Sequence, residues 1–325
     1  MRRREFIAGL GSAAAWPVVA RAQQPKMPVV GYLGPGTEVA SREYLSAING
    51  GLAETGYVLG RNLAIESRWA DDRYDRLPAL ADELVRRQVS VIVPLNSAAS
   101  SVAKAATQSI PIVFMAGVDP VGGLVASLNR PGGNLTGITI LLTEVTAKRL
   151  EILHELLPTA TLIAVVVNST NAAFAEPEKR ELLAAARILG LQLLILDVRD
   201  PSEFDAAFAT AIAGRVGAVL VGGDILFFSH FDKLVALAAK YRVPAIFPER
   251  AAVVMGGLVA YGTDFPAAYH QLGMYAGRVL KGEKPSDLPV QQVTKVELII
   301  NLKTVKALHL TVPESILVRA SEVIE

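Results

Sequence analysis

The 325-residue chain is predicted to fold into two α/β lobes, each with a parallel sheet. Short apolar runs rich in β-branched residues alternate with longer helical patterns after Lys26, as in βαβ units. The central runs are apolar on both faces, which is typical of a sheet covered by helices on each side. The runs at 89–96 and 110–117 resemble those at 216–224 and 243–250, which indicates a weak internal repeat. These observations favour two lobes that share the same order of strands and helices.

The first half of the chain contains apolar runs short enough for strands. They lie at 29–34, 63–70, 90–96, 111–117 and 135–139. Helical patterns between them are expected from Ser41, a capping residue, to about Thr55, over 74–88, and from about Ser97. Gly56 ends the first of these helices. Strand and helix therefore alternate as a parallel sheet requires.

The second half repeats the alternation. Strands are expected at 162–168, 191–198, 217–224, 244–248 and 258–262. Helices are expected at 177–190, 202–214 and about 229–241, the first of them ended by Gly190. We place the first lobe at 27–140 plus about 262–290, and the second at 141–261 plus about 291–325.

Residues 1–22 have the pattern of an export signal. An arginine cluster precedes an apolar stretch, and Ala20-Arg21-Ala22 fits the small-residue rule for signal peptidase. Arg3 and Arg4, followed by Phe6, resemble a twin-arginine signal. The apolar stretch is interrupted and too short for a membrane anchor. We therefore expect cleavage after Ala22 and a soluble periplasmic protein.

The amino-acid composition and the spacing of certain residues argue against several classes of function. Lysine and arginine total 32 against 31 acidic residues, so no nucleic-acid-binding surface is indicated. Cysteine is missing from the sequence, which excludes disulfides and thiolate metal sites. The four histidines show no i, i+3 or i, i+4 pair, and the glycines after the first strand do not form a dinucleotide-binding motif. We expect neither a metal nor a cofactor.

Ligands of parallel α/β sheets collect beyond the carboxyl ends of the strands. The residues at these positions here are mostly small or polar: Gly34, Thr37, Asn96, Ser97, Gly117, Asp119, Asn168, Asp224, Glu249, Tyr261 and Thr263. Asp119 allows three interpretations, which are a catalytic acid paired with Asp224, a ligand-binding carboxylate, and a turn residue before Pro120. We favour the ligand-binding carboxylate.

Several longer segments resemble a known family. They are DPVGGLVASLNRPGGNLTG, GGLVAYGTD and the C-terminal stretch from GRVLKGEKPSDLP to the end of the chain. Together these segments are similar to extracytoplasmic solute-binding proteins of ABC importers, of the tryptophan/tyrosine type. The resemblance implies a type I periplasmic-binding-protein-like fold: two Rossmann-like lobes that close like a hinge on a ligand in the cleft between them.

The resemblance also implies a site and partners. Asn96, Ser97, Gly117 and Asp119 form the first-lobe side, and Asn168, Asp224 and Tyr261 the second-lobe side. Gly34, Thr37, Glu249 and Thr263, which follow from their places at strand ends and not from the resemblance, are secondary candidates. Asn168-Ser169-Thr170-Asn171 departs from the Asn-Pro of the family pattern.

The implied function is capture of an amino acid, aromatic in the named members, or a related carboxylate. No catalysis is implied. The implied partner is an ABC permease in the inner membrane, and we expect a monomer. The alternatives are an exported hydrolase that uses Asp119 and Asp224, and a sensory ligand-binding module.

Overall fold

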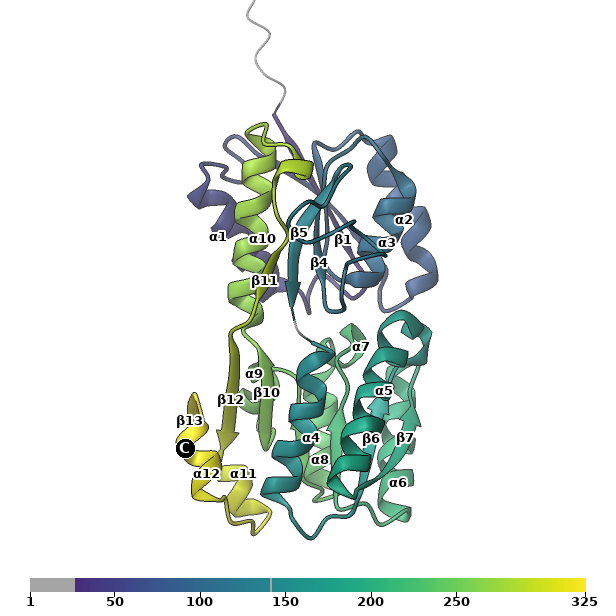
Figure 1. Cartoon of the computed structure of the whole chain (residues 1–325), viewed down its shortest axis with the longest axis vertical. Helices are drawn as coiled ribbons and strands as arrows, with labels where there is room; N and C mark the ends of the chain where they lie inside the picture. Colours follow the sequence, from purple (N-terminus) through teal and green to yellow (C-terminus); the bar gives the residue numbers. More distant parts are fainter. Residues whose placement is uncertain (1–26, 141) are drawn as a thin grey trace, which may run out of the picture.

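A computed structural model describes residues 27–140 and 142–325. Within these residues the strands form two sheets, one of six strands and one of seven. Each sheet is the centre of one lobe, and the lobes lie end to end (Figure 1). This confirms the predicted α/β class with two lobes. The signal residues Arg3, Arg4 and Phe6 lie outside the described residues, so the export signal stays a prediction.

The first lobe has a fully parallel sheet in the order β11-β5-β4-β3-β1-β2. Its strands are β1 (Val29–Gly34), β2 (Ala64–Trp69), β3 (Val91–Pro94), β4 (Ile112–Ala116), β5 (Leu135–Ile140) and β11 (Gln291–Val293). Its helices are α1 (Arg42–Glu54), η1 (Tyr74–Arg76), α2 (Leu77–Arg86), α3 (Ser97–Ala106), α10 (Phe265–Leu280) and η4 (Pro285–Asp287).

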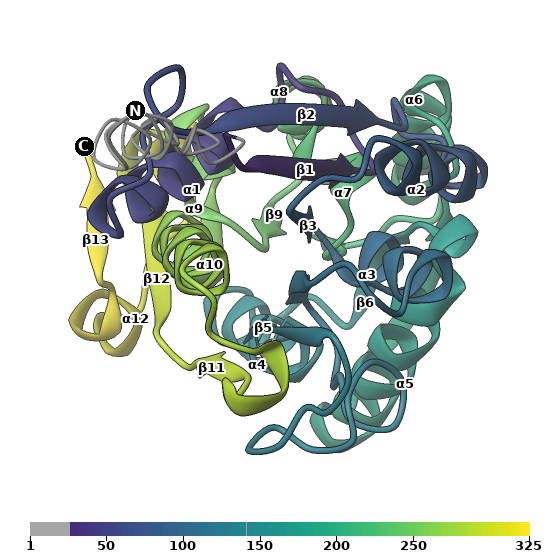
Figure 2. The same ribbon diagram turned by 90° about the horizontal axis from the view of Figure 1, so that it is seen from above.

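Helices cover both faces of this sheet, with α1 and α10 on one side and α2 and α3 on the other (Figure 2). The α1 and α10 backbones approach closely because glycine stands at the contact. A Cβ added to Gly51 would lie 2.0 Å from the carbonyl oxygen of His270, and one added to Gly273 would lie 2.0 Å from that of Ile48. Any larger residue would force the two helices apart.

The second lobe has the strand order β13-β12-β10-β9-β8-β6-β7, in which only β10 and β12 pair antiparallel among the described residues. Its strands are β6 (Leu162–Val167), β7 (Gln192–Asp197), β8 (Ala218–Val221), β9 (Ala245–Phe247), β10 (Val259–Thr263), β12 (Val296–Asn301) and β13 (Glu322–Ile324). Its helices are α4 (Glu144–Leu156), η2 (Ser169–Asn171), α5 (Ala172–Leu189), η3 (Pro201–Glu203), α6 (Phe204–Ala213), α7 (Ile225–Phe228), α8 (Phe231–Lys240), α9 (Arg250–Val254), α11 (Leu302–Ala307) and α12 (Glu314–Arg319).

The two sheets share one strand order. β5-β4-β3-β1-β2 in the first lobe corresponds to β10-β9-β8-β6-β7 in the second, the order of a doubly wound sheet. The runs that resemble each other in sequence occupy equivalent places, because 89–96 contains β3 and 216–224 contains β8. The carboxyl ends of both sheets face the junction of the lobes (Figure 1).

The chain passes between the lobes after β5, after β10 and after β11. Two of these crossings differ by a few residues from the sequence-based boundaries at 261 and 290. Gly262 and Thr263 still belong to β10 of the second sheet, and β11 pairs with β5 of the first. Val290 and Val293 are buried against the first lobe, which explains why this short segment stays there.

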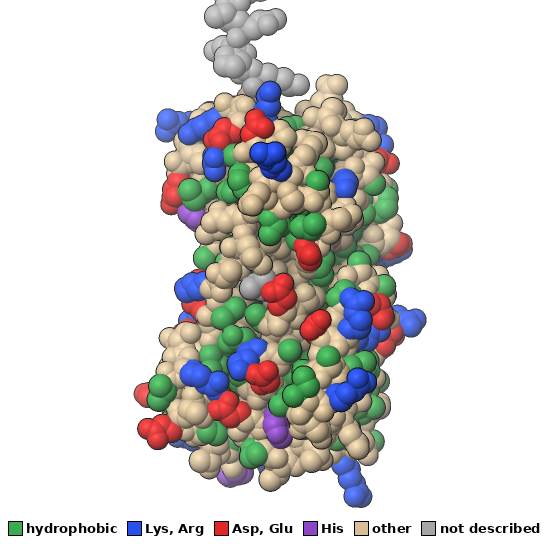
Figure 3. Space-filling model, in the orientation of Figure 1, with side chains coloured by type: hydrophobic (Ala, Val, Ile, Leu, Met, Phe, Trp, Pro, Cys, Tyr) green, Lys and Arg blue, Asp and Glu red, His purple; other side chains and the backbone are tan. Residues whose placement is uncertain are grey.

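Helix boundaries show two further differences from the sequence patterns. α5 begins at Ala172, five residues before the expected start at Pro177, and the proline lies inside the helix. α4 occupies Glu144–Leu156, where the patterns assigned no helix. None of the helices in the described part of the chain is both long and apolar enough to cross a bilayer. Acidic and basic side chains are mixed over the face shown in Figure 3.

Candidate functional site

A small cavity lies between the lobes, at the carboxyl ends of strands from both sheets. Its volume is about 40 Å³. Its lining combines a polar end on each lobe with apolar side chains between: Leu95, Asn96, Ser97, Met115, Gly117, Ile140, Leu142, Asn171, Phe174, Gly223, Asp224, Ile225, Phe228, Phe265 and Tyr269. Asn96, Ser97, Gly117 and Asp224 are among the positions indicated by the sequence. We call this space the central cavity.

The first lobe contributes the N-terminus of α3. Asn96 caps this helix, since its side-chain oxygen accepts a hydrogen bond from the Ala99 N–H at 2.9 Å. The Ser97 hydroxyl accepts from the Gly117 N–H at 2.9 Å, which ties the start of α3 to the loop after β4. The first N–H groups of a helix and its dipole favour an anion at this end. This wall of the central cavity is therefore electropositive.

The second lobe contributes a buried carboxylate, that of Asp224, which is 4% exposed. It accepts hydrogen bonds from Asn168 Nδ2 at 2.9 Å, Asn171 Nδ2 at 2.8 Å and the Leu226 N–H at 3.0 Å. The Tyr74 hydroxyl, from the first lobe, donates to it at 3.1 Å. Asn168 thus acts on the cavity through Asp224, because it is not itself a lining residue.

None of these donors to Asp224 carries a positive charge. Burial raises the pKa of Asp224, and the hydrogen bonds from Asn171 and Asn168 oppose that rise. Burial also raises the pKa of Tyr74, with a further contribution from the charge of Asp224. A buried carboxylate held only by neutral donors favours contact with a cation. The second wall is therefore electronegative and faces the N-terminus of α3.

Two of the positions indicated by the sequence lie away from the central cavity. Asp119 is exposed, and its Oδ1 accepts a hydrogen bond from the Val121 N–H at 2.9 Å, which makes it a turn residue. Tyr261 points to the opposite face of the second sheet, where it lines a surface depression with Lys148 and Leu298. Tyr261 is the middle residue of β10, two residues before the carboxyl end of the strand, whereas the central cavity lies beyond the strand ends. The structure does not bring Asp119 and Asp224 together.

Gly34 and Thr37 also lie outside the central cavity. A Cβ on Gly34 would come within 2.0 Å of the Trp69 ring, so this glycine allows β1 and the Trp69 side chain to pack. The Thr37 hydroxyl accepts from the Ala40 N–H at 3.3 Å and shapes the turn before α1. Gly34 at the end of β1 and Thr37 in the loop that follows therefore both have local structural roles.

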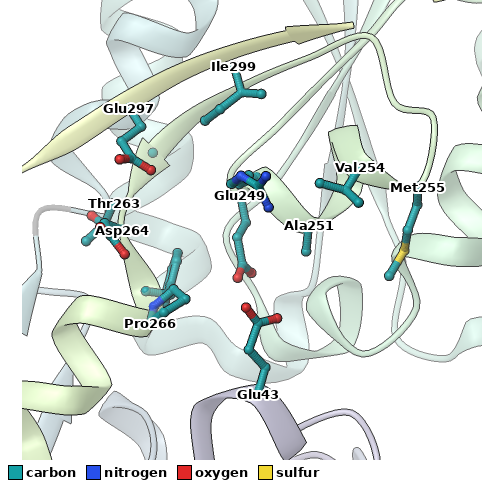
Figure 4. Close-up of a pocket in the computed structure, with 13 residues that line it drawn as sticks. Glu43, Glu249, Ala251, Val254, Met255, Thr263, Asp264, Pro266, Glu297 and Ile299 are labelled. Carbon is teal, nitrogen blue, oxygen red and sulfur yellow. The ribbon is translucent and has the colours of Figure 1, made fainter. Parts of the chain in front are cut away.

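Glu249 and Thr263 line a second pocket, of about 190 Å³ (Figure 4). Phe265 is a lining residue of both spaces. The Tyr44 hydroxyl of the first lobe donates to Glu249 Oε2 at 2.6 Å. Burial raises the pKa of Glu249 to about 7. The carboxylates of Glu249 and Glu43 point toward one another in Figure 4.

Polar contacts cross the cleft at several places. Tyr74 reaches Asp224, Tyr44 reaches Glu249, and His230 Nε2 lies 3.1 Å from Asp72 Oδ2. Each joins a residue of the first lobe to one of the second. Movement of the lobes apart would break all of these contacts. Within residues 27–140 and 142–325, no cluster of His, Asp and Glu could hold a metal ion.

Sequence patterns did not indicate several residues of the site. Asn171 lies in the segment whose sequence departs from the family pattern, and this departure was the available signal. Tyr74 reaches the site from a 3-10 helix of the opposite lobe, which no strand-end rule could indicate. The aromatic side chains of the cavity were indistinguishable from core residues by sequence: Phe174, Phe228, Phe265 and Tyr269.

Comparison with known proteins gives consistent results. A "Tyrosine-binding protein" of Clostridioides difficile is 28% identical over 277 residues, covering 85% of this chain and 78% of that protein. A solved structure from Streptococcus pneumoniae, an ABC domain in complex with L-Trp, is 26% identical with a TM-score of 0.82. The match covers 91% of this chain and 99% of that one.

A more distant match shows the fold alone. A leucine-binding protein of Thermotoga maritima is 15% identical, with a TM-score of 0.57, and the match covers 78% of this chain and 81% of that one. This likeness places the two lobes in the type I periplasmic-binding-protein class, as the resemblance implied.

The family comparison covers most of the chain. Residues 38–324 match the profile of the family described as "ABC transporter substrate binding protein". Both lobes, the central cavity and the second pocket lie within that match. Proteins of this kind are extracytoplasmic binding proteins, and binding requires no catalytic pair. The chain therefore belongs to the ABC transporter substrate-binding protein family.

Proposed function

We propose that this protein is the exported, periplasmic solute-binding protein of an ABC importer and that its ligand is an amino acid, preferably aromatic. The observation that carries the proposal is the opposition of two charges across an apolar cavity. The N-terminus of α3 lies on one lobe and the buried Asp224 carboxylate on the other. The names of the Clostridioides and Streptococcus proteins support an aromatic ligand.

The chemistry of a zwitterion fits this arrangement. The ligand's ammonium group pairs with Asp224, which lacks a cationic partner among its hydrogen-bond donors. Its carboxylate binds at the N-terminus of α3, with Asn96, Ser97 and the Gly117 loop around it. Its side chain packs against the aromatic wall that includes Phe174, which favours an aromatic partner.

The size of the central cavity implies movement of the lobes. At about 40 Å³ it is a narrow space lined by side chains of both lobes, with room for a few water molecules. Capture therefore requires the lobes to separate and close again around the ligand, as hinged binding proteins do. Opening also removes Tyr74 from Asp224 Oδ2, because Tyr74 belongs to the first lobe. The ligand's ammonium group then takes the place of the Tyr74 hydroxyl.

Delivery to an inner-membrane ABC permease completes the proposal. We place the protein in the periplasm as a monomer after cleavage of residues 1–22. Asn96, Ser97, Gly117, Asn168 and Asp224 are the site residues on which the proposal rests. Asp119, Tyr261, Gly34 and Thr37 have no part in it, and Glu249 and Thr263 belong to the neighbouring pocket.

Calorimetry on residues 23–325 tests the proposal, with L-tryptophan, L-tyrosine, L-leucine and L-aspartate as ligands. Binding of an aromatic amino acid is expected. Asp224→Asn removes the charge partner of the ammonium group and should weaken binding at least about 30-fold, or about 2 kcal/mol.

The matched control is Asp119→Asn, an equal change in an exposed turn, which should leave affinity unchanged. Tryptamine and indole-3-propionate, which lack the carboxylate and the amine respectively, should each bind more weakly than L-tryptophan. An unchanged affinity in Asp224→Asn, or no binding of any amino acid by the wild type, would contradict the proposal.

A further inference from the structure

A buried ion pair lies directly behind the loop that presents Asp224. Arg149 of α4 and Glu178 of α5 are 3.0 Å apart, and their side chains are 0% and 2% exposed. Burial lowers the pKa of Arg149 and raises that of Glu178, so each charge depends on the other. Removing two charges from water costs several kcal/mol per ion, and apolar replacements of such pairs are often neutral or stabilising. Stability alone is therefore a poor explanation for this pair.

The hydrogen bonds of the pair converge on one short stretch of main chain. Arg149 Nη1 donates to the Val221 carbonyl oxygen at 2.9 Å. Glu178 Oε1 accepts from the Gly223 N–H at 3.0 Å. Val221 ends β8, and Gly223 immediately precedes Asp224. The two charges thus hold the main chain on both sides of Gly222.

The fit around Gly222 is close. A Cβ added there would lie 2.7 Å from Glu178 Oε2 and 2.7 Å from the Val166 carbonyl oxygen. A residue with a side chain would have to displace either the carboxylate or a neighbouring strand. Gly223 is itself a lining residue of the central cavity. A shift of the Glu178 side chain would therefore move Gly223 in the cavity wall, because the two are joined by a hydrogen bond to the main chain.

The same network reaches a crossing between the lobes. The Thr146 hydroxyl lies 3.1 Å from both Glu178 Oε1 and the carbonyl oxygen of Leu142, and Arg149 Nη2 donates to Thr146 Oγ1. Leu142 lies in the crossing between β5 and α4 and lines the central cavity. One buried network therefore connects this crossing to the loop that carries Asp224.

We propose that Arg149 and Glu178 are positioning residues: they fix the main chain from Val221 to Gly223, and with it the Asp224 carboxylate, relative to the crossing between the lobes. They touch no ligand and act through Asp224. This inference deepens the proposed function and rests on it, because the geometry of Asp224 matters for affinity only if a cationic group binds there.

The test separates positioning from stability. Arg149→Met/Glu178→Leu replaces the pair by apolar side chains of similar size. We expect its melting temperature to stay within a few degrees of the wild type while its affinity for L-tryptophan falls at least 10-fold. Lys148→Met/Glu151→Leu, the adjacent exposed pair on α4, is the matched control and should change neither quantity.

A double-mutant cycle provides a readout that a general packing role would not change. In an Asp224→Asn background, Arg149→Met/Glu178→Leu should weaken L-tryptophan binding less than twofold further, because the two sites act through one carboxylate. Independent effects that multiply in the triple variant would overturn the proposal. An unchanged affinity in the wild-type background would also overturn it.

A second variant covers the case in which the first does not fold. In Arg149→Met/Glu178→Gln the amide oxygen still accepts from the Gly223 N–H, so a smaller affinity loss, about threefold, is expected. A loss as large as that of Asp224→Asn would contradict the proposal.

If the wild type binds no amino acid, the proposed function has failed. A crystal structure of the apolar variant then decides the positioning role. A displaced Gly222–Asp224 main chain supports the role, and an unmoved one overturns it.

Discussion

The two lobes place opposite charges at equivalent positions of one topology. β3 and β8 occupy the same place in their sheets. β3 leads to Asn96 and the N-terminus of α3, which attract an anion, whereas β8 leads to Gly223 and the buried Asp224, which attract a cation. The first lobe uses main-chain dipoles and hydroxyls, while the second uses carboxylates and a buried ion pair. A shared fold therefore fixes where the walls lie, and the side chains after each strand decide what they bind.

The two lobes also differ in charge after β9 and its counterpart β4. The buried carboxyl group after β9 gives the largest change in stability that we predict. Glu249 lies two residues after β9, where the first lobe has the uncharged Val118 two residues after β4. Because burial raises the pKa of Glu249 from 4.5 to about 7, the fold favours its protonated form. Its contribution to the free energy of unfolding is complete below about pH 4.5 and is lost as pH rises to about 7. The loss amounts to about 3 kcal/mol.

Glu249→Gln should remove this pH dependence between about pH 4.5 and 7, since the amide does not titrate. Urea denaturation of both proteins across this range measures the difference. Glu43→Gln is the control, because Glu43 is exposed and raises the pKa of Glu249 less than burial does. If the stability of wild type and Glu249→Gln depended on pH in the same way, the pKa of Glu249 would not be raised by folding, and the prediction would be wrong.

Removing the N-cap of α3 in the first lobe should have an effect of intermediate size on stability and affinity. Asn96→Ala removes the hydrogen bond to the Ala99 N–H and should cost about 1 kcal/mol of stability. Because the cap holds the proposed carboxylate subsite, affinity for L-tryptophan should also fall several-fold, less than for Asp224→Asn.

Asn301→Ala provides the matched control for Asn96→Ala. Asn301 caps α11 in the second lobe and is not a lining residue of the central cavity. It should lose stability without losing affinity. Equal affinity losses in the two variants, measured by calorimetry, would show that α3 has no special relation to the ligand.

The smallest expected effect concerns a contact that joins the lobes. Asp72→Asn weakens the pairing with His230 across the cleft, and asparagine tolerates the positive φ of 63° at this position. Partly exposed pairs contribute about 1 kcal/mol or less. Affinity for L-tryptophan should fall at most about fivefold, through faster dissociation in stopped-flow measurements.

Asp71→Asn is the control for Asp72→Asn. Asp71 pairs with Arg76 inside the first lobe and has a similar backbone conformation. Its replacement should leave the dissociation rate unchanged. A faster dissociation in this variant too would mean that the loop, and not the contact between the lobes, controls release.

The sequence predicted more of the fold than of the site, for a physical reason. Runs such as 29–34 identified β1 to the residue, because burial on both faces leaves a continuous apolar signal. The strand-end rule indicated Asp224, but it also indicated Asp119, which lies in the turn after β4 and points to solvent. Position along a strand does not give side-chain direction in the loop that follows. Contacts between lobes, such as Tyr74 with Asp224, leave no local pattern at all.

The close contact of α1 with α10 has a consequence for synthesis of the protein. The glycine-lined face of α1 leaves the ribosome early, yet its partner belongs to a segment made only after the second lobe's first five strands. Until then the apolar face of α1 lacks its native cover, and the first sheet lacks its β11 edge. The nascent first lobe therefore keeps apolar surface exposed to solvent, and it completes its core only when the last quarter of the chain arrives.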